Sequence, residues 1–126
     1  MAARPNPVGW FEIYVDDLAR AKAFYEAVFD TTTQELEGGD DLQMLAFPMD
    51  NEARGCAGAL VHMNGMSAGG NTTIVYFMSD DCAVEAGRVS ANGGRIFKDK
   101  FSIGEYGFIA LAYDTEGNMF GIHSMK

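Results

Sequence analysis

Residues 113–124 have the sequence YDTEGNMFGIHS, which predicts the end of one strand, a tight turn and a final strand. Asp114 and Gly117 suit the turn, because aspartate accepts hydrogen bonds from the backbone that follows it and glycine adopts positive φ freely. The residues after the turn alternate between two faces, with Phe120 and Ile122 on one and Met119, Gly121 and His123 on the other. The alternation predicts a half-buried strand, and the second face is a candidate site.

A second alternating segment lies near the N-terminus, at residues 8–15. One face is wholly apolar and suits packing against a helix: Phe11, Ile13 and Val15. The other face places Glu12 between the aromatic residues Trp10 and Tyr14. Asp16 and Asp17 then suit the cap of a helix from Leu18 to about Phe29, because a carboxylate accepts from the free amides of the first turn.

The apolar residues of that helix recur at helical spacing and predict one buried stripe: Leu18, Ala21, Tyr25 and Val28, widened by Phe24. Strands are expected at 31–36, 42–47 and 57–62, and residues 63–71 have the composition of a linker. A polar loop at 48–55 separates the last two of these strands. The first half of the chain therefore predicts the order βαβββ.

The second half repeats this order. Residues 72–79 predict a strand with one face formed by Ile74, Tyr76 and Met78. Asp80 and Asp81 cap a helix that the glycines of 92–94 terminate. Strands follow at 95–97, 108–113 and 118–124, with a polar loop at 98–107. The sequence thus predicts an α+β fold of two βαβββ modules, about 8–62 and 72–126, each with a helix covering one face of its strands.

Composition narrows the class of protein. The chain has 126 residues, 48% of them hydrophobic, which suits a single globular domain with a real core. A net charge of −9 disfavours binding to nucleic acid or to anionic membranes. There is no apolar leader before Gly9 and no run long enough to span a membrane. With only Cys56 and Cys82, we expect a reduced, cytoplasmic protein.

Three motifs in this order resemble the vicinal oxygen chelate superfamily, which includes glyoxalase I, bleomycin-resistance proteins and extradiol dioxygenases. They are VDDLARAKAFY at 15–25, NGG at 92–94 and DTEGN at 114–118, and the resemblance covers nearly the whole chain. It implies that the paired modules curl into one U-shaped mixed sheet with the helices on its outer face. It also implies a ligand groove on the inner face and a homodimer.

Enzymes of this superfamily bind a divalent metal in the groove through His, Glu or Gln side chains on inward strand positions. Carried onto this chain, those positions fall on Trp10, Ala59, Ile74 and Gly121. None of these side chains can ligate a metal, so no cofactor is predicted, and a divalent metal held by displaced ligands is the alternative.

The resemblance implies a groove with an aromatic and apolar lining, which is typical of small-molecule sites. The candidate ligand-binding residues are Trp10, Tyr14, Ile74, Tyr76, Met78, Met119 and Gly121, with Gly121 expected to leave open space. Glu12 and His123 are candidate catalytic residues, as an acid–base couple. The structural alternative is that Glu12 bonds a tyrosine or a backbone amide and that His123 faces water. His62 suits a structural or surface role, and a metal site of Glu12, His62 and His123 is a weaker alternative.

Three functions remain open at this point. The first is a metal-free protein that binds a small organic molecule in the groove. The second is an isomerase or lyase that uses Glu12 with His123, or a metal enzyme with displaced ligands. The third is a protein whose groove is filled and which acts through dimer or partner contacts. Loops 48–55 and 98–107 are candidate lids for such a groove.

Overall fold

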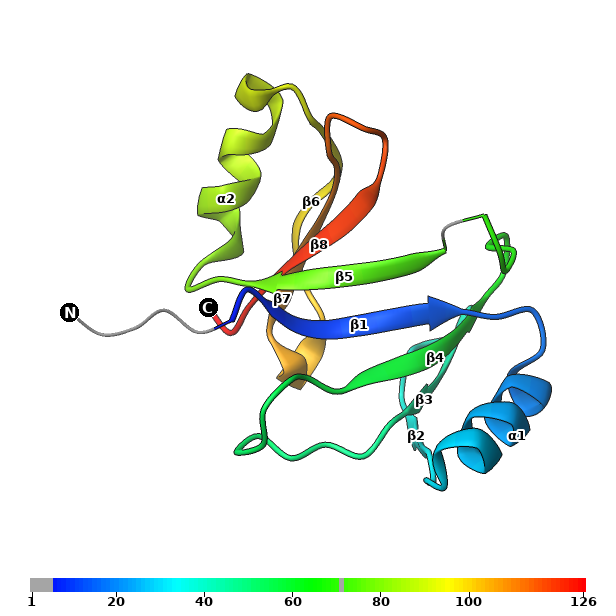
Figure 1. Cartoon of the computed structure of the whole chain (residues 1–126). Helices are drawn as coiled ribbons and strands as arrows, with labels where there is room; N and C mark the ends of the chain where they lie inside the picture. The colour runs from blue at the N-terminus through cyan, green and yellow to red at the C-terminus, as the bar shows by residue number, and fades with distance from the viewer. Residues whose placement is uncertain (1–5, 71) are drawn as a thin grey trace. The chain divides into compact units, whose positions relative to one another are not determined.

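The computed structural model describes residues 6–70 and 72–126 and gives an α+β fold (Figure 1). The first βαβββ series consists of β1 (Val8–Tyr14), α1 (Leu18–Phe29), β2 (Gln34–Leu36), β3 (Leu42–Ala46) and β4 (Gly58–Met63). The second consists of β5 (Thr73–Met78), α2 (Cys82–Val89), β6 (Arg95–Ser102), β7 (Phe108–Tyr113) and β8 (Met119–Ser124). Short 3-10 turns, η1 (Ser90–Asn92) and η2 (Gly104–Tyr106), precede β6 and β7. The predicted order and fold class are confirmed.

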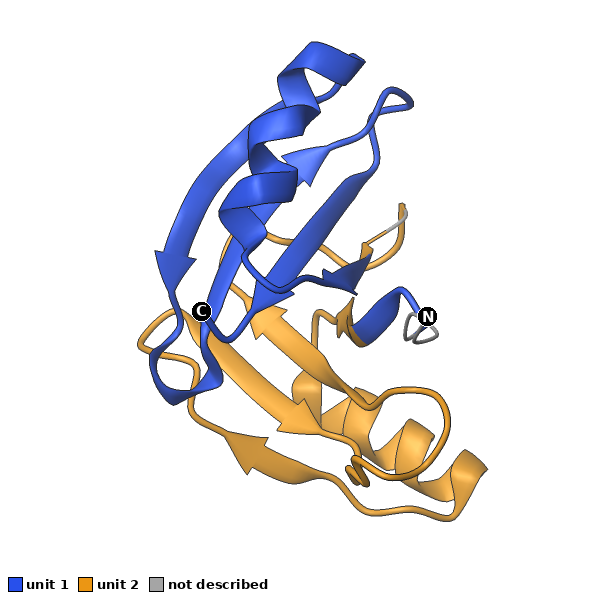
Figure 2. Cartoon of the chain, turned by 90° about the vertical axis from the view of Figure 1, so that its left-hand side faces the viewer, with its two compact units in different colours: residues 1–9, 74–126 blue, residues 10–73 orange. Residues whose placement is uncertain are grey.

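The chain divides into two compact units, which Figure 2 shows in separate colours. Unit 2 comprises residues 10–73, and unit 1 comprises residues 1–9 and 74–126. Within unit 2 the strand order is β2-β3-β4-β1, with β1 parallel to β4 and the other pairs antiparallel. Within unit 1 the order is β5-β8-β7-β6, with β5 parallel to β8. Each unit is therefore a mixed sheet with one helix, and the U-shaped arrangement of the modules and the single domain stay predictions.

The core of unit 2 lies between its sheet and α1. Its buried residues are Val15, Leu45 and Leu60, and Leu18, Ala21 and Tyr25 of α1 pack against them. Asp17 begins the helix by accepting from the Arg20 amide at 3.0 Å, as predicted. The predicted stripe is wrong at two positions, because Phe24 and Val28 are 58% and 57% exposed. α1 thus packs through a narrower face than its sequence suggests.

The core of unit 1 lies between its sheet and α2. Its buried residues are Cys82, Ala86, Ala110 and Ile122, with Ile96, Phe108 and Phe120 packed around them. Phe77 of β5 meets Phe120 edge to face, with ring centroids 5.8 Å apart. The helix side of β8 therefore carries Phe120 and Ile122, and Met119, Gly121 and His123 lie on the opposite face, as the alternation predicted.

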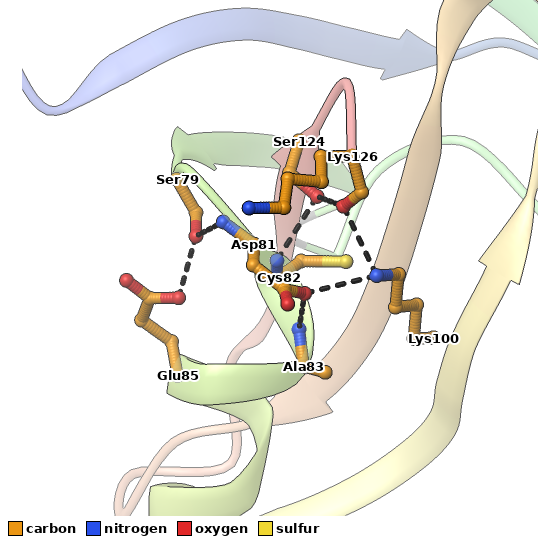
Figure 3. Close-up of polar contacts among 8 residues, drawn as sticks. All are labelled: Ser79, Asp81, Cys82, Ala83, Glu85, Lys100, Ser124 and Lys126. Atoms are coloured by element: carbon orange, nitrogen blue, oxygen red, sulfur yellow. Dashed lines mark hydrogen bonds and ion pairs between the residues drawn. The ribbon is translucent and has the colours of Figure 1, made fainter.

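A polar network fixes the start of α2 to the end of β8 (Figure 3). Asp81 caps the helix by accepting from the Ala83 amide at 3.1 Å and forms an ion pair with Lys100 at 2.9 Å. The Lys100 bond, followed by the Ala83 bond, holds the pKa of Asp81 below its usual range. The buried Ser124 hydroxyl accepts from the Cys82 amide at 2.9 Å. The network is structural, since it satisfies the free amides of the first helical turn.

The second half departs from prediction at β6. We expected a strand over 95–97 and a loop over 98–107, but β6 continues to Ser102, so the loop is confined to 103–107. The strand is irregular, with register shifts between Ile96 and Lys98 and between Lys98 and Phe101. These bulges break the period-two pattern from which a strand is predicted. Residues 98–102 therefore belong to a strand, and a lid in this region would be limited to residues 103–107.

Candidate functional site

Three side chains on one face of β1 form a local cluster in unit 2. Glu12 accepts from the Tyr14 hydroxyl at 2.9 Å through one carboxylate oxygen and from the Trp10 indole nitrogen at 3.3 Å through the other. Their spacing of two residues places all three on the same side of the strand. Tyr14 is buried, whereas Trp10 and Glu12 are half-buried. The cluster is thus a carboxylate oriented by two aromatic donors and still partly accessible.

Apolar residues of β3 and β4 lie beside this cluster on the same sheet face. In the register between β1 and β4, Glu12 lies opposite Ala59 and Tyr14 lies opposite Val61. Val61 in turn lies opposite Met44 of β3. Ala59 and Val61 are fully buried, so the floor beside the carboxylate excludes water. The resemblance placed Ala59 at an inward position, but sequence reasoning missed Val61 and Met44, because only the strand register brings them to the same face as Glu12.

His62 lies away from the Glu12 cluster. It lies on β4 directly after Val61 and pairs with Gln43 of β3. Because successive residues of a strand point to opposite faces, its side chain points to the face that α1 covers. Its Nδ1 lies 3.0 Å from the Val15 carbonyl oxygen, a contact that a protonated Nδ1 makes as a donor. A metal site that combines Glu12 with His62 is therefore wrong, and the structural role predicted for His62 is confirmed.

The remaining candidate residues lie in unit 1, on the sheet face opposite α2. Tyr76 pairs with Gly121 and Met78 pairs with His123 in the parallel register of β5 and β8. Ile74 and Tyr76 are buried, Met119 is half-buried, and Met78 is 54% exposed. The amide of Met78 donates to the Pro7 carbonyl at 2.8 Å, so residues just before β1 also join this unit.

Gly121 does not leave the open space that the sequence predicts. A Cβ at this position would lie 2.5 Å from Cε1 of Tyr76 and closer still to Cδ1. The tyrosine ring therefore occupies the place where a side chain at position 121 would project. Gly121 is required for close packing of that ring, and it offers a ligand backbone atoms alone.

His123 is held by the loop that precedes β7. Its Nε2 lies 2.5 Å from the Tyr106 carbonyl oxygen, which fixes a donor role for Nε2 and leaves Nδ1 as the acceptor of a neutral ring. The residue is half-buried. Glu12 belongs to the other compact unit, and an acid–base couple between these two side chains stays a prediction.

Aromatic and basic residues that the sequence analysis missed lie on the same face as Met119. Tyr113 pairs with Met119 across β7 and β8, and the Arg95 guanidinium stands 4.5 Å from the centre of the Tyr113 ring. Phe97 meets the same ring edge to face. The register of the bulged β6 decides these contacts, so no sequence pattern signalled them.

This chain has no ligating side chains at the positions that bind the metal in enzymes of the superfamily. Trp10, Ala59, Ile74 and Gly121 carry no ligating atom, and the Tyr76 ring fills the space beside Gly121. Across residues 6–70 and 72–126, no group of three or more His, Cys, Asp or Glu side chains is placed to hold a metal ion. The side chains present therefore do not fit the metal site that the resemblance implies.

Comparisons with known proteins agree with the motifs. Residues 8–29 match the family described as bleomycin resistance protein-like N-terminal. Two mycobacterial relatives, from Mycobacterium bovis and Mycobacterium tuberculosis, share 31% identity over 115 residues and are both named "Putative glyoxylase CFP32". The alignment covers 90% of this chain and 42% of each relative, so the chain spans less than half their length.

Solved structures share the fold at low sequence identity. Methylmalonyl-CoA epimerase from Mycobacterium tuberculosis superposes with a TM-score of 0.71 and 14% identity, over 100% of this chain and 93% of that one. A Streptomyces coelicolor methylmalonyl-CoA epimerase gives 0.68 and 14%, over 96% and 98%. Together with the sequence matches, these shared folds confirm the resemblance to the vicinal oxygen chelate superfamily and to its glyoxalase and bleomycin-resistance-like proteins. Neither helix in the described part of the chain has the length and apolar character needed to cross a membrane.

Proposed function

We propose that this protein binds a small organic molecule, without a metal, against the sheet face that carries Trp10, Glu12 and Tyr14. The observation that carries the proposal is the half-buried Glu12 carboxylate, which the Tyr14 hydroxyl and the Trp10 indole orient. A fixed acceptor between aromatic rings and beside an apolar floor suits a ligand with a flat ring and a hydrogen-bond donor or positive charge.

The side chains at the metal-ligand positions favour binding without a metal. The superfamily positions for metal ligands carry an indole, a methyl group, an isoleucine and a glycine in this chain, none of which coordinates a divalent ion. Recognition then depends on stacking and hydrogen bonding alone. The matched bleomycin-resistance-like segment, residues 8–29, includes the whole Trp10–Tyr14 cluster and so supports this placing of the site.

Two measurements test the proposal. Mass spectrometry of the native protein, before and after incubation with manganese, nickel, zinc and ferrous iron, should give less than stoichiometric metal. A melting-shift screen of flat organic cations should then give compounds that stabilise the wild type and lose their effect on Trp10→Ala and Glu12→Gln. Glu35→Gln is the matched control, because this exposed strand glutamate pairs with Leu45 on the opposite face of the same sheet.

Equal shifts in Glu12→Gln and Glu35→Gln would contradict the proposal. One metal ion per chain, lost in Glu12→Gln, would contradict it as well. Circular dichroism of each variant should show an unchanged fold, so that lost binding is assigned to the side chain.

A second candidate is an isomerase that uses Glu12 and His123. Several of the similar structures are epimerases, one of them in complex with methylmalonyl-CoA, and this observation favours the candidate. In this candidate Glu12 would take a proton from the carbon beside a carbonyl group, and His123, when it carries a proton on Nδ1 as well, would return one to that carbon. Incubation with methylmalonyl-CoA in deuterated water tests it. Deuterium at the α-carbon that is lost in Glu12→Gln and in His123→Ala would favour the enzyme, and no incorporation would exclude this substrate.

A further inference from the structure

The chain contains two Asn-Gly dipeptides, Asn64-Gly65 and Asn92-Gly93, whose backbones are held differently. In such a dipeptide the backbone nitrogen of the glycine can attack the side-chain amide of the asparagine, because glycine has no Cβ to hinder the approach. Both asparagines are exposed, so access to water does not distinguish them. The hydrogen bonds of the reacting groups therefore decide which of the two sites can react.

Asn64 and Gly65 are the two central residues of a turn that directly follows β4. The turn is closed by the Met66 amide, which donates to the Met63 carbonyl oxygen at 3.1 Å. The Asn64 side chain makes one long contact, from Nδ2 to Oδ1 of Asp41 at 3.4 Å. Within residues 6–70 and 72–126 the Gly65 amide donates to no acceptor, and no atom lies within 4 Å of a Cβ built on Gly65. Neither a hydrogen bond nor a side chain thus holds the Gly65 nitrogen away from Asn64.

Asn92 and Gly93 are held at the end of a helix. Asn92 is the last residue of η1, and its Nδ2 donates to the Arg88 carbonyl oxygen at 2.8 Å. The Gly93 amide donates to the Ser90 carbonyl oxygen at 3.3 Å. Both groups that would have to react at this site therefore satisfy free carbonyl groups where α2 and η1 end.

We propose that Asn64 is a site of spontaneous deamidation in the folded protein and that Asn92 is protected. The Gly65 nitrogen forms a bond to Cγ of Asn64, the bond from Cγ to Nδ2 breaks, and the proton of the Gly65 amide leaves with Nδ2 as ammonia. Water then opens the succinimide at either carbonyl group and gives aspartate or isoaspartate. The reaction consumes water, releases ammonia and needs no oxidant or cofactor.

The product changes the segment that follows β4. The backbone amide of Asn64 donates to the Asp41 carbonyl oxygen at 3.4 Å, and its side chain contacts the Asp41 carboxylate, so Asn64 joins the end of β4 to the start of β3. A carboxylate at position 64 loses the side-chain donor and faces Asp41 with like charge. We expect faster amide hydrogen exchange over residues 64–68 in Asn64→Asp than in the wild type. Adding Asp41→Asn to that variant restores a pair of one amide and one carboxylate and should restore slow exchange.

Peptide mapping by mass spectrometry tests the proposal on the folded full chain, incubated at mildly alkaline pH in an ammonium-free buffer. Asn64 should convert at least about ten times faster than Asn92, because two ordinary hydrogen bonds have to open at Asn92 first. Isoaspartate should appear at position 64, since direct hydrolysis of the side chain gives aspartate alone. In urea that unfolds the chain, the two rates should converge.

Two matched variants assign the acidic product. Asn64→Gln should prevent its formation, because glutamine would have to close a larger ring, and Asn92→Gln should leave its rate unchanged. Asn92 converting as fast as Asn64 in the folded chain, aspartate without isoaspartate at position 64, or conversion of Asn64 in urea alone would overturn the proposal. Equal hydrogen exchange in Asn64→Asp and the wild type would contradict the predicted effect on residues 64–68.

Discussion

Replacing Gly121 with alanine tests how tightly the centre of β8 is packed. The added Cβ would lie 2.5 Å from Cε1 and 3.0 Å from Cγ of Tyr76, and closer still to Cδ1. Carbon atoms in good contact are about 3.5–4.0 Å apart, so the ring would have to move by roughly 1 Å. Tyr76 is only 6% exposed, which leaves it little room. Overpacking of this kind costs about 1–3 kcal/mol, or roughly 4–12 °C in Tm for a chain of this size.

The same substitution at Gly87 is the control. No atom lies within 4 Å of a Cβ at this position, and Gly87 is inside α2, where alanine is the better helix former by about 1 kcal/mol. Urea unfolding followed by circular dichroism should therefore show a loss of stability for Gly121→Ala and a gain for Gly87→Ala. A Gly121→Ala variant as stable as the wild type would refute the reasoning, because the space beside β8 would then be open to a ligand.

Three other substitutions have outcomes that follow from single contacts. Glu26 has its pKa lowered from 4.5 to about 2, first by the Lys22 bond, so its ionised form stabilises the fold above about pH 4.5. Glu26→Gln should thus lower Tm at pH 7, and the difference from wild type should vanish as the pH falls to 2. Ser124→Ala leaves the buried Cys82 amide without its acceptor and should cost about 1–3 kcal/mol in urea unfolding. Gly58→Ala forces a Cβ into the backbone of the neighbouring strand and should cost about 3 kcal/mol in the same assay.

The strand faces were predictable because period-two alternation has a single interpretation once one face is apolar. Phe11, Ile13 and Val15 had to meet a helix, which left Glu12 and its aromatic neighbours on the other side. The helix starts were equally clear. Asp17 accepts from the amide three residues on, and Asp81 from the amide two residues on, as capping carboxylates do.

The burial of α1 could not be predicted in the same way. Its sequence contains two overlapping stripes, one through Leu18, Ala21 and Tyr25 and another through Phe24 and Val28. Spacing alone does not tell which stripe meets the sheet, because both satisfy the helical period. The sheet of unit 2 decides it by placing Val15, Leu45 and Leu60 beneath the first stripe. The wide apolar face that the sequence of α1 suggests is therefore two faces, one packed in the core and one exposed.

Gly121 shows a different limit to what the sequence alone predicts. A glycine within a strand signals the close approach of another group, but the sequence does not identify that group. The resemblance suggested a missing carboxylate and hence an empty space, whereas the parallel register of β5 and β8 places Tyr76 opposite it. Only the pairing of residues 45 positions apart in the chain reveals that contact, and local patterns carry no information at this separation.

Glu12 satisfies both the structural and the functional interpretation that its sequence allows. It bonds a tyrosine, as the structural interpretation requires, and it is half-buried on an apolar face, as a ligand site requires. The free energy of unfolding and the ligand affinity of a Tyr14 variant distinguish the structural from the functional interpretation. If the bond mainly stabilises the fold, Tyr14→Phe should lower the free energy of unfolding and leave ligand affinity unchanged. If the bond mainly orients a recognition group, the same variant should fold almost as well as the wild type and lose affinity. The second outcome is expected, because the half-buried Glu12 keeps its Trp10 bond when the Tyr14 hydroxyl is removed, whereas that hydroxyl fixes the direction in which the carboxylate accepts.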